Sequence, residues 1–302
     1  MSKYVKTVGK GVMWLVILGL VYYFGVAKLL EEELSSEQIL SAYQYSNSYQ
    51  DFAVHTEQGK SREFTFTSFD GEKVYGQITL PSVKREKYPV LVGVHAMGRS
   101  YPRWYQSELK GRPTVSSVNQ ITELALAKGY AVVAIDARFH GKRKLESKPL
   151  RSIWNDLHYF GDKSDYQDMI VNTVIDNRVL LDWIEKQPEL DAEHITVAGY
   201  SMGGQVSLLL GAVDKRVDQI AAIVPPYLED TVATVATKNL VSQIKQDARV
   251  LIIYGEHDDV ATVEQNRALH EKLTSTDKQL IGFDADHILP EVYVEDVGAW
   301  LK

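Results

Sequence analysis

The chain has 302 residues, a formal net charge of −7 and no cysteine. This length suits one large α/β domain or two small ones, and an apolar share of 45% is enough for a full core. The lack of cysteine excludes disulfides and thiolate metal sites, the acidity argues against a nucleic-acid partner, and no metal-binding or phosphate-binding motif occurs, so we expect no metal and no cofactor.

The first 30 residues are predicted to be a membrane anchor, outside the folded domain. Lys3, Lys6 and Lys10 precede an uncharged run at 11–27, which makes about 25 Å of helix. Three glutamates follow at 31–33. Because lysine and arginine accumulate on the cytoplasmic flank of a span, we expect the N-terminus in the cytoplasm and the rest on the periplasmic or extracellular side.

A cleaved secretory signal explains the same charge pattern. Gly25-Val26-Ala27 has the small residues of an acceptable cleavage site. Aromatic residues lie toward the ends of the apolar run, as in the aromatic belt of a membrane span. We favour the uncleaved anchor, with residues 11–30 as the membrane contact, and both interpretations place the remaining chain outside the cytoplasm.

The next two segments differ in composition. Residues 31–61 are polar and tyrosine-rich, which predicts a tether with a short helix. From residue 62 to 81, apolar and polar residues alternate, and Asp70-Gly71 divides the segment as the turn of a β-hairpin would. The folded domain is therefore predicted to occupy residues 62–302.

From Tyr88 onward, apolar strands alternate with helical patterns. This order predicts an α/β fold with a mostly parallel, doubly wound sheet and antiparallel N-terminal strands. The strands are expected at 90–94, 131–135, 194–199, 220–224, 250–254 and 278–283, and the helices at 118–128, 165–186, 205–212 and 289–301. Residues 225–249 are expected to form a small cap over the edge of the sheet where α/β folds bind their ligands. Residues 99–117, with Tyr101, Trp104 and Tyr105, are expected to overhang the same edge.

Gly199-Tyr200-Ser201-Met202-Gly203 follows one of these strands and opens a helix. A serine on such a turn has its hydroxyl exposed, and glycine is needed beside it because a side chain would collide with the neighbouring strand or helix. The backbone N–H of Met202, at the helix start, points toward the place where an oxyanion would form. The pattern predicts a nucleophilic serine with one oxyanion donor.

Two further loops follow predicted strands, at the edge of the sheet where α/β folds place their ligands. One loop contains Asp258 and the other contains His287, so the three residues occur in the order serine, acid, histidine. A histidine takes the serine proton at neutral pH, and a carboxylate holds its tautomer. Asp258 is the expected acid, and Asp259 is the alternative.

Residues 62–302 resemble the serine hydrolases of the α/β-hydrolase fold, in their dienelactone-hydrolase-like and prolyl-oligopeptidase-like esterase branch. The resemblance rests on Gly199-Tyr200-Ser201-Met202-Gly203-Gly204, Gly255-Glu256-His257-Asp258, Asp286-His287 and Asp136-Ala137-Arg138-Phe139-His140-Gly141. It implies that Ser201 is the nucleophile, Asp258 the acid and His287 the base, with backbone donors at Met202 and Met97.

One motif departs from that family. Its usual His-Gly-x-Gly is His95-Ala96-Met97-Gly98 here, so alanine replaces the first glycine in the loop of the second donor. Structural roles are expected for His95 under this loop and for His140, and a surface position for His257.

The predicted function is a membrane-tethered serine hydrolase that cleaves carboxylic esters through an acyl-enzyme. An amidase or acyl-aminopeptidase would use the same three residues, and an acyltransferase would accept an alcohol in place of water. A catalytically inactive, anchored scaffold is the alternative from a different class. The expected partners are a small-molecule ester or amide and the membrane.

Overall fold

The computed structural model describes residues 2–46 and 48–302, with side chains from residue 12 onward. A nine-stranded sheet forms its centre, in the order β1-β2-β3-β7-β4-β8-β9-β10-β11. The pairs from β1 to β7 along this order are antiparallel, and those from β7 to β11 are parallel. The strands are β1 (Gln50–Gln58), β2 (Ser61–Thr67), β3 (Lys73–Thr79), β4 (Tyr88–Val94), β7 (Ala131–Ile135), β8 (Leu190–Tyr200), β9 (Val217–Ile223), β10 (Arg249–Gly255) and β11 (Asp277–Phe283).

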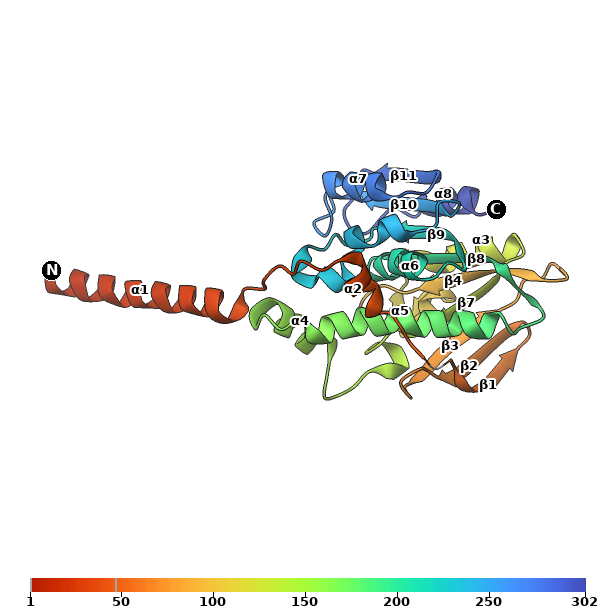
Figure 1. Cartoon of the computed structure of the whole chain (residues 1–302), viewed down its shortest axis with the longest axis horizontal. Coiled ribbons are helices and arrows are strands. Elements are labelled where there is room, and N and C mark those ends of the chain that lie inside the picture. Colours follow the sequence, from red (N-terminus) through yellow and green to blue (C-terminus); the bar gives the residue numbers. More distant parts are fainter. Residues whose placement is uncertain (1, 47) are drawn as a thin grey trace.

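Helices cover both faces of the sheet (Figure 1). One face carries α2, α4, α5, α6 and α7, and the opposite face carries α3 and α8. The helices are α1 (Ser2–Tyr22), α2 (Ser36–Ser41), α3 (Val118–Ala127), α4 (Leu150–Tyr159), α5 (Ser164–Ile184), α6 (Met202–Val213), α7 (Val263–Lys272) and α8 (Tyr293–Trp300), with a π-helical turn η1 (Tyr23–Ala27) after α1 and short 3-10 helices η2 (Tyr101–Trp104), η3 (Gly141–Arg143), η4 (Asp230–Val235), η5 (Thr237–Asn239) and η6 (Val241–Gln243).

The central strands are apolar along their whole length because helices bury both of their faces. In β4, Val90 and Val92 pack on the side of α5 and α6, whereas Leu91 packs on the side of α3 and α8. All three side chains are fully buried. Gly93 in the same strand leaves room for Trp104, whose ring would lie 2.4 Å from an added Cβ.

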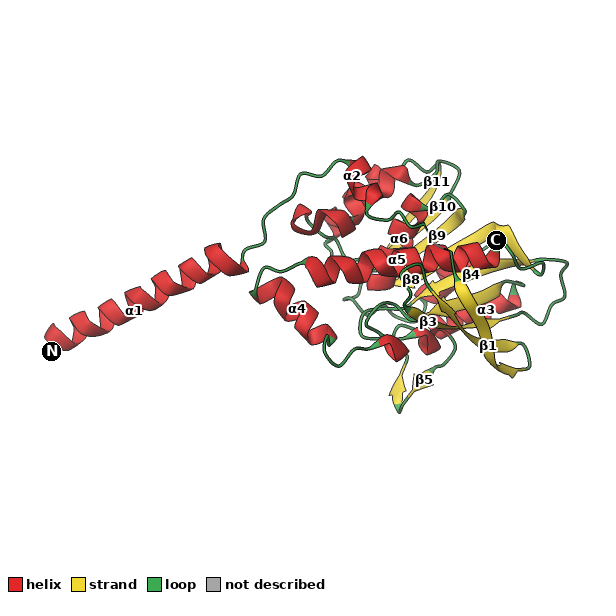
Figure 2. Ribbon diagram, turned by 60° about the horizontal axis from the view of Figure 1, so that its bottom comes forward, coloured by secondary structure: helices red, strands yellow, loops and turns green. Residues whose placement is uncertain are grey.

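These observations confirm the predicted mixed, mostly parallel sheet with an antiparallel start. The hairpin around Asp70-Gly71 is β2–β3, and Gly71 has the positive φ of 88° that its turn needs. The strand predicted at 131–135 is β7 with the same bounds. The strands and α-helices without a counterpart in the prediction are β1, α4, α7 and the small hairpin of β5 (Glu108–Leu109) and β6 (Arg112–Pro113), which projects from the body of the domain in Figure 2.

Residues 31–61 differ from the predicted tether, because this segment is attached to the domain through α2, Tyr43 and β1. Ile39 of α2 and Tyr43 are 1% and 0% exposed. β1 then adds an edge strand to the sheet, and its Phe52 stacks on Trp183 of α5 at 4.2 Å between ring centroids. Isolated apolar residues in a polar segment carry no periodic signal, so the prediction could not show that tertiary contacts bury them. The folded domain therefore begins in this segment.

The N-terminal helix α1 extends away from the domain (Figures 1 and 2). Apolar side chains that are described here lie largely in solvent, among them Leu15 at 71% and Phe24 at 63% exposure. The lysines at 3, 6 and 10 lie where side chains are not described. Within the described residues, no helix has the length and apolarity needed to cross a membrane.

Residues 225–249 form an irregular layer of short 3-10 helices over α5 and α6. Val235, Leu240 and Val241 are fully buried there. The carbonyl of Asp230 accepts a hydrogen bond from the backbone N–H of Glu32, 2.9 Å away, which ties the start of the domain to this layer.

Candidate active site

Ser201 lies on a sharp turn between β8 and α6, the helix that follows this strand. Its φ of 56° and ψ of −119° are unusual for a residue with a side chain. The chain passes so closely here that an added Cβ on Gly199 would lie 2.1 Å from the carbonyl oxygen of Gly203, and one on Gly203 would lie 2.1 Å from that of Val94. The two glycines therefore permit the turn that presents the serine hydroxyl.

The structure brings Ser201, His287 and Asp258 into one hydrogen-bonded row. The Nε2 atom of His287 lies 2.8 Å from Oγ of Ser201, and its Nδ1 atom lies 2.7 Å from Oδ2 of Asp258. Asp258 follows β10 and its side chain is 2% exposed, whereas His287 follows β11 and is 27% exposed. An ionised carboxylate only accepts hydrogen bonds, so Nδ1 carries the ring proton and Nε2 accepts the proton of the serine hydroxyl.

The second carboxylate oxygen of Asp258 is also occupied. Oδ1 accepts a hydrogen bond from the backbone N–H of Val260 at 2.8 Å. Both oxygens are therefore held, and the carboxylate cannot rotate away from His287 without losing a charge-assisted bond. The alternative acid, Asp259, is an exposed residue with no hydrogen bond to His287.

Tyr200, directly before the serine, was not predicted as part of the site. Its hydroxyl donates a hydrogen bond to the backbone carbonyl of His287 at 2.8 Å and accepts one from the N–H of Leu289 at 3.0 Å. Burial raises the pKa of this hydroxyl to about 12, so it keeps its proton. No sequence pattern marks this role, because both partners are backbone atoms of a loop far along the chain.

The loop after β4 lies beside the serine. A turn closed by the hydrogen bond from Arg99 N–H to Ala96 carbonyl, 3.1 Å long, contains Met97 and Gly98, and Gly98 has the φ of 73° that this turn needs. The amide N–H of Met97 has no acceptor within the described residues, and that of Met202 is one of the free N–H groups at the start of α6. Both methionines line a cavity together with Ser201.

His95 supports this loop from below, as the sequence predicted. Its Nε2 accepts the backbone N–H of Ala137 at 3.0 Å, which leaves the proton on Nδ1, and Nδ1 donates to the carbonyl of Ala96 at 2.9 Å. Complete burial lowers the pKa of His95 to about 4, so the ring stays neutral. The histidine thereby joins the loop after β4 to the loop after β7.

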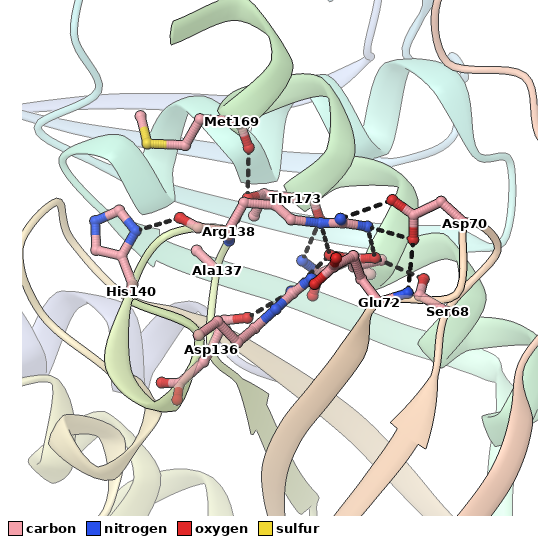
Figure 3. Close-up of polar contacts among 12 residues, drawn as sticks. Ser68, Asp70, Glu72, Asp136, Ala137, Arg138, His140, Met169 and Thr173 are labelled. Carbon is pink, nitrogen blue, oxygen red and sulfur yellow. Dashed lines mark hydrogen bonds and ion pairs between the residues drawn. The ribbon is translucent and has the colours of Figure 1, made fainter. Parts of the chain in front are cut away.

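The loop after β7 is held by a cluster of charges in which Arg138, Arg143 and Asp176 are buried (Figure 3). Arg138 donates to both oxygens of Asp176 at 2.7 and 2.9 Å and to both oxygens of Asp70 at 2.7 and 3.0 Å. Arg143 adds a 2.6 Å bond to Asp176. A buried guanidinium that is paired bidentately in this way holds a rigid orientation. The loop is therefore structural, and none of these side chains lines the cavities that contain Ser201.

The histidines that the sequence assigned to structural or surface positions occupy such positions. His140 is fully buried beside Arg138, to whose carbonyl its Nδ1 donates at 2.6 Å. Burial, reinforced by the nearby His95, lowers the pKa of His140 to about 3. His257 lies on the surface, where it pairs with Asp284 at 2.7 Å.

Two cavities meet at Ser201. The larger one, of about 330 Å³, is mostly apolar and is lined by Met97, Tyr166, Met202 and residues 226–229 of the predicted cap, together with Leu29 and α4. The smaller one, of about 160 Å³, lies on the other side and is lined by His287, Ile288, Arg99, Arg103 and residues 113–116. The predicted aromatic residues of 99–117 do not line either cavity, because Trp104 is fully buried and Tyr105 bonds to the carbonyls of Gln77 and Val132.

Several solved structures of esterases have a similar fold. Acetyl xylan esterase 1 from Thermoanaerobacterium sp. JW/SL YS485 is 17% identical with a TM-score of 0.65, covering 88% of this chain and 92% of that chain. Acetyl xylan esterase from Paenibacillus sp. R4 is 17% identical with a TM-score of 0.65, covering 90% and 95%. The Pyrococcus furiosus esterase Pf2001 is 21% identical with a TM-score of 0.58, covering 83% and 98%. A search of curated protein sequences finds no match.

The protein is thus a serine hydrolase of the α/β-hydrolase fold, and its class of substrate is an ester. The family model described as acetyl xylan esterase (AXE1) matches residues 32–239, more than half of the chain, and the chain belongs to that family. The match begins at 32, inside the segment that had been predicted as a tether. It includes Ser201 but ends before Asp258 and His287. The assignment of these two residues to the site therefore depends on their hydrogen bonds.

Proposed function

We propose that this protein hydrolyses carboxylic esters through a covalent acyl-enzyme formed on Ser201. The observation that carries the proposal is the unbroken row of hydrogen bonds from Ser201 through His287 to Asp258. Oγ of Ser201 attacks the ester carbonyl carbon while its proton passes to Nε2 of His287. The imidazolium that forms is stabilised by the carboxylate of Asp258.

The negative charge that develops on the carbonyl oxygen needs hydrogen-bond donors. The free backbone N–H groups of Met202 and Met97 take this role in our proposal, since both residues line the cavity at the serine. The tetrahedral intermediate then expels the alcohol, which receives its proton from Nε2 of His287. Water then attacks the acyl-enzyme while its proton passes to the same nitrogen. The second tetrahedral intermediate expels Oγ of Ser201, which takes this proton back from His287, and the carboxylic acid is released.

The two cavities have different roles in this scheme. The leaving alcohol must reach His287, so it occupies the smaller cavity, which His287 lines. The acyl group occupies the larger apolar cavity on the opposite side of Ser201. Its volume of about 330 Å³ lies at the lower end of small-molecule pockets, roughly 300–1,000 Å³, so acyl groups longer than acetyl should also be accepted. The acetyl esters named in the family description are the simplest substrates to begin with.

The test combines labelling and substrate comparison. A fluorophosphonate probe should label the wild-type protein and not Ser201→Ala. That variant should also lose about a million-fold in kcat on a p-nitrophenyl ester series of increasing acyl length. Activated esters should be cleaved far faster than the corresponding anilides. Faster cleavage of anilides would favour an amidase, ester formation with added alcohols would favour an acyltransferase, and an unlabelled, inactive wild type would favour a scaffold.

We further propose that the N-terminal segment attaches this catalytic domain to a membrane, with the domain on the non-cytoplasmic side. The support comes from the charge pattern of this segment and from its exposed apolar side chains. Lysines precede the apolar run and glutamates follow it, and the described apolar side chains of α1 are exposed. Near the end of α1, the helix α4 exposes Trp154 and Tyr159, at 48% and 59%, and Phe160 directly after it is 55% exposed. Such aromatic side chains are favoured at a membrane surface.

This attachment is tested by fractionation and protease accessibility of the full chain. In spheroplasts of a bacterial host, external protease should release the domain by cutting near Leu30, the exposed residue before the packed segment. A cytoplasmic marker protein serves as the control for intact membranes. Full protection of the domain would contradict the proposed side, and a mature N-terminus at Lys28 would replace the anchor by a cleaved signal.

A further inference from the structure

We propose that a basic cavity beside the active site is a subsite for an anionic group on the alcohol portion of the ester substrate. This inference rests on the proposed function, because it extends the alcohol side of that site. The ligand chemistry is an alcohol that also carries a carboxylate, phosphate or sulfate group, for example an acylated acidic sugar. We refer to the cavity as the basic subsite.

The basic subsite has a volume of about 530 Å³ and a strongly uneven charge. Two acidic residues line it, Glu63 and Asp136. The six basic residues that line it are Arg99, Arg103, Lys110, Arg112, Lys142 and Lys144. The whole chain carries a net charge of −7, so this accumulation of positive charge is opposite to the protein as a whole. A concave surface lined by one sign of charge attracts ligands of the opposite sign.

Most of this positive charge is not neutralised. Among the described residues, Arg99, Lys110, Arg112 and Lys144 form no ion pair, and Lys142 approaches Glu63 only at 3.5 Å with both side chains exposed. The carboxylate of Asp136 is already occupied, since it accepts the backbone N–H groups of Tyr101 at 3.0 Å and Lys142 at 2.8 Å. Four cationic side chains thus remain available to a ligand.

The arginines of this cavity lie close enough for their positive charges to repel one another. The guanidinium of Arg103 is buried against the β5–β6 hairpin, where its Nη1 donates to the carbonyl of Arg112 at 2.6 Å and to the hydroxyl of Thr114 at 3.1 Å. Burial, and then the charges of Arg99 and Arg112, lower its pKa. A bound anion would relieve this repulsion, and arginine suits carboxylate, phosphate and sulfate because its donors match their geometry.

The basic subsite is continuous with the alcohol side of the active site. Arg99 and Arg103 line both the basic subsite and the smaller cavity that holds Ser201 and His287. Gly98, which also lines the basic subsite, directly follows the oxyanion residue Met97. The larger apolar cavity shares none of the six basic residues. An anion bound here therefore belongs to the alcohol and not to the acyl group.

The experiment compares three substrates on the full-length protein. They are mono-O-acetylated methyl glucoside, methyl glucuronoside and methyl glucoside 6-phosphate, each acetylated at the same ring position. We expect kcat/KM to be about tenfold or more higher for one or both anionic sugars than for the neutral sugar at low salt. The carboxylate and phosphate arms show which anion is preferred. Because exposed charges are screened, this preference should shrink as salt is raised from about 0.05 to 0.5 M.

Two variants locate the effect. Lys110→Gln combined with Arg112→Gln, and separately Lys144→Gln from the opposite loop, should each reduce the ratio of anionic to neutral kcat/KM several-fold. The matched control is Lys84→Gln combined with Lys87→Gln, which removes two exposed charges just before the amino end of β4, at the opposite end of the sheet from Met97. The control should keep the ratio.

The outcomes separate this inference from the function on which it rests. Equal kcat/KM for neutral and anionic sugars, with active enzyme, would overturn the basic subsite alone. An anionic preference that both basic-residue variants keep would also overturn it. Failure of the wild type to cleave any acetylated substrate, including a simple activated ester, would overturn the proposed ester hydrolysis.

Discussion

The hydroxyl of Tyr200 holds the backbone of His287, to whose carbonyl it donates a hydrogen bond of 2.8 Å. The residue before Ser201 thereby positions the loop of His287. Leu289 completes the arrangement by donating its N–H to the same hydroxyl at 3.0 Å. A single side chain therefore fixes both ends of the segment 287–289 relative to the serine.

We expect Tyr200→Phe to lower kcat about tenfold with little change in KM. The substitution leaves a buried carbonyl and N–H unpaired, at a cost of about 1–3 kcal/mol in the free energy of unfolding, and it loosens the position of the base. Steady-state kinetics and the rate of fluorophosphonate labelling measure the effect. Tyr130→Phe is a matched control, since that hydroxyl bonds to the carbonyl of Lys302. Equal loss of kcat in both variants would contradict a positioning role.

The identity of the acid can be decided by two neighbouring variants. Asp258→Asn should lower kcat on the order of ten-thousand-fold, because an amide favours the wrong tautomer of His287. Asp259→Asn should cost far less, since its side chain does not contact the histidine. Measurement of kcat for the pair, with circular dichroism to verify folding, tests the assignment. The reverse ranking would move the acid by one position.

The loop of Met97, which we propose as the second oxyanion donor, offers a further test. Gly98 has a φ of 73°, and no described atom beyond its two chain neighbours lies within 4 Å of an added Cβ, so backbone strain alone opposes a side chain there. Gly98→Val should displace Met97 and lower kcat by roughly ten- to a thousand-fold, the scale of losing one donor. Ala96→Gly should change kcat little, because Ala96 does not have a positive φ. A folded, fully active Gly98→Val protein would show that Met97 is not a donor.

The buried histidine at position 140 makes stability depend on pH. Its pKa is about 3 in the folded protein and near 6.5 when unfolded, so the unfolded state binds the proton first and stability falls as pH drops below about 6.5. Between pH 7 and pH 5 the expected loss is about 2 kcal/mol from this residue. Urea unfolding of the wild type and His140→Asn at both pH values measures it. The variant should lose less stability over this interval, and an identical loss in both proteins would contradict the assignment.

Much of the sheet could be predicted because its signals are local. The strand at 131–135 is a wholly apolar run between Gly129, which ends a helix, and Asp136, which begins a loop. The three residues of the hydrogen-bonded row were also predictable, because each follows an apolar strand and the carboxyl ends of parallel strands meet at one edge. Their order along the chain, which is serine, acid and histidine, indicated the role of each residue.

Other features depended on contacts that no local pattern encodes. Ile39 and Tyr43 lie in a polar segment, and only their tertiary partners bury them. Tyr200 acts through backbone atoms, which every residue has. The basic residues of the basic subsite come from separate segments, namely the loop after β4, the β5–β6 hairpin and the loop after β7, and only the tertiary structure brings these segments together.

The strand order has a consequence for how activity is gained during folding. Ser201, Asp258 and His287 follow β8, β10 and β11. Together with β9, these strands are parallel neighbours, so each connection between them must return over one face of the sheet to the starting end. Parallel pairings bring together distant parts of the chain, so they form slowly. No fragment with only one or two of these strands in place holds the whole row. Recovery of ester hydrolysis after dilution from denaturant should therefore lag behind the recovery of helical signal, and it would report completion of the sheet.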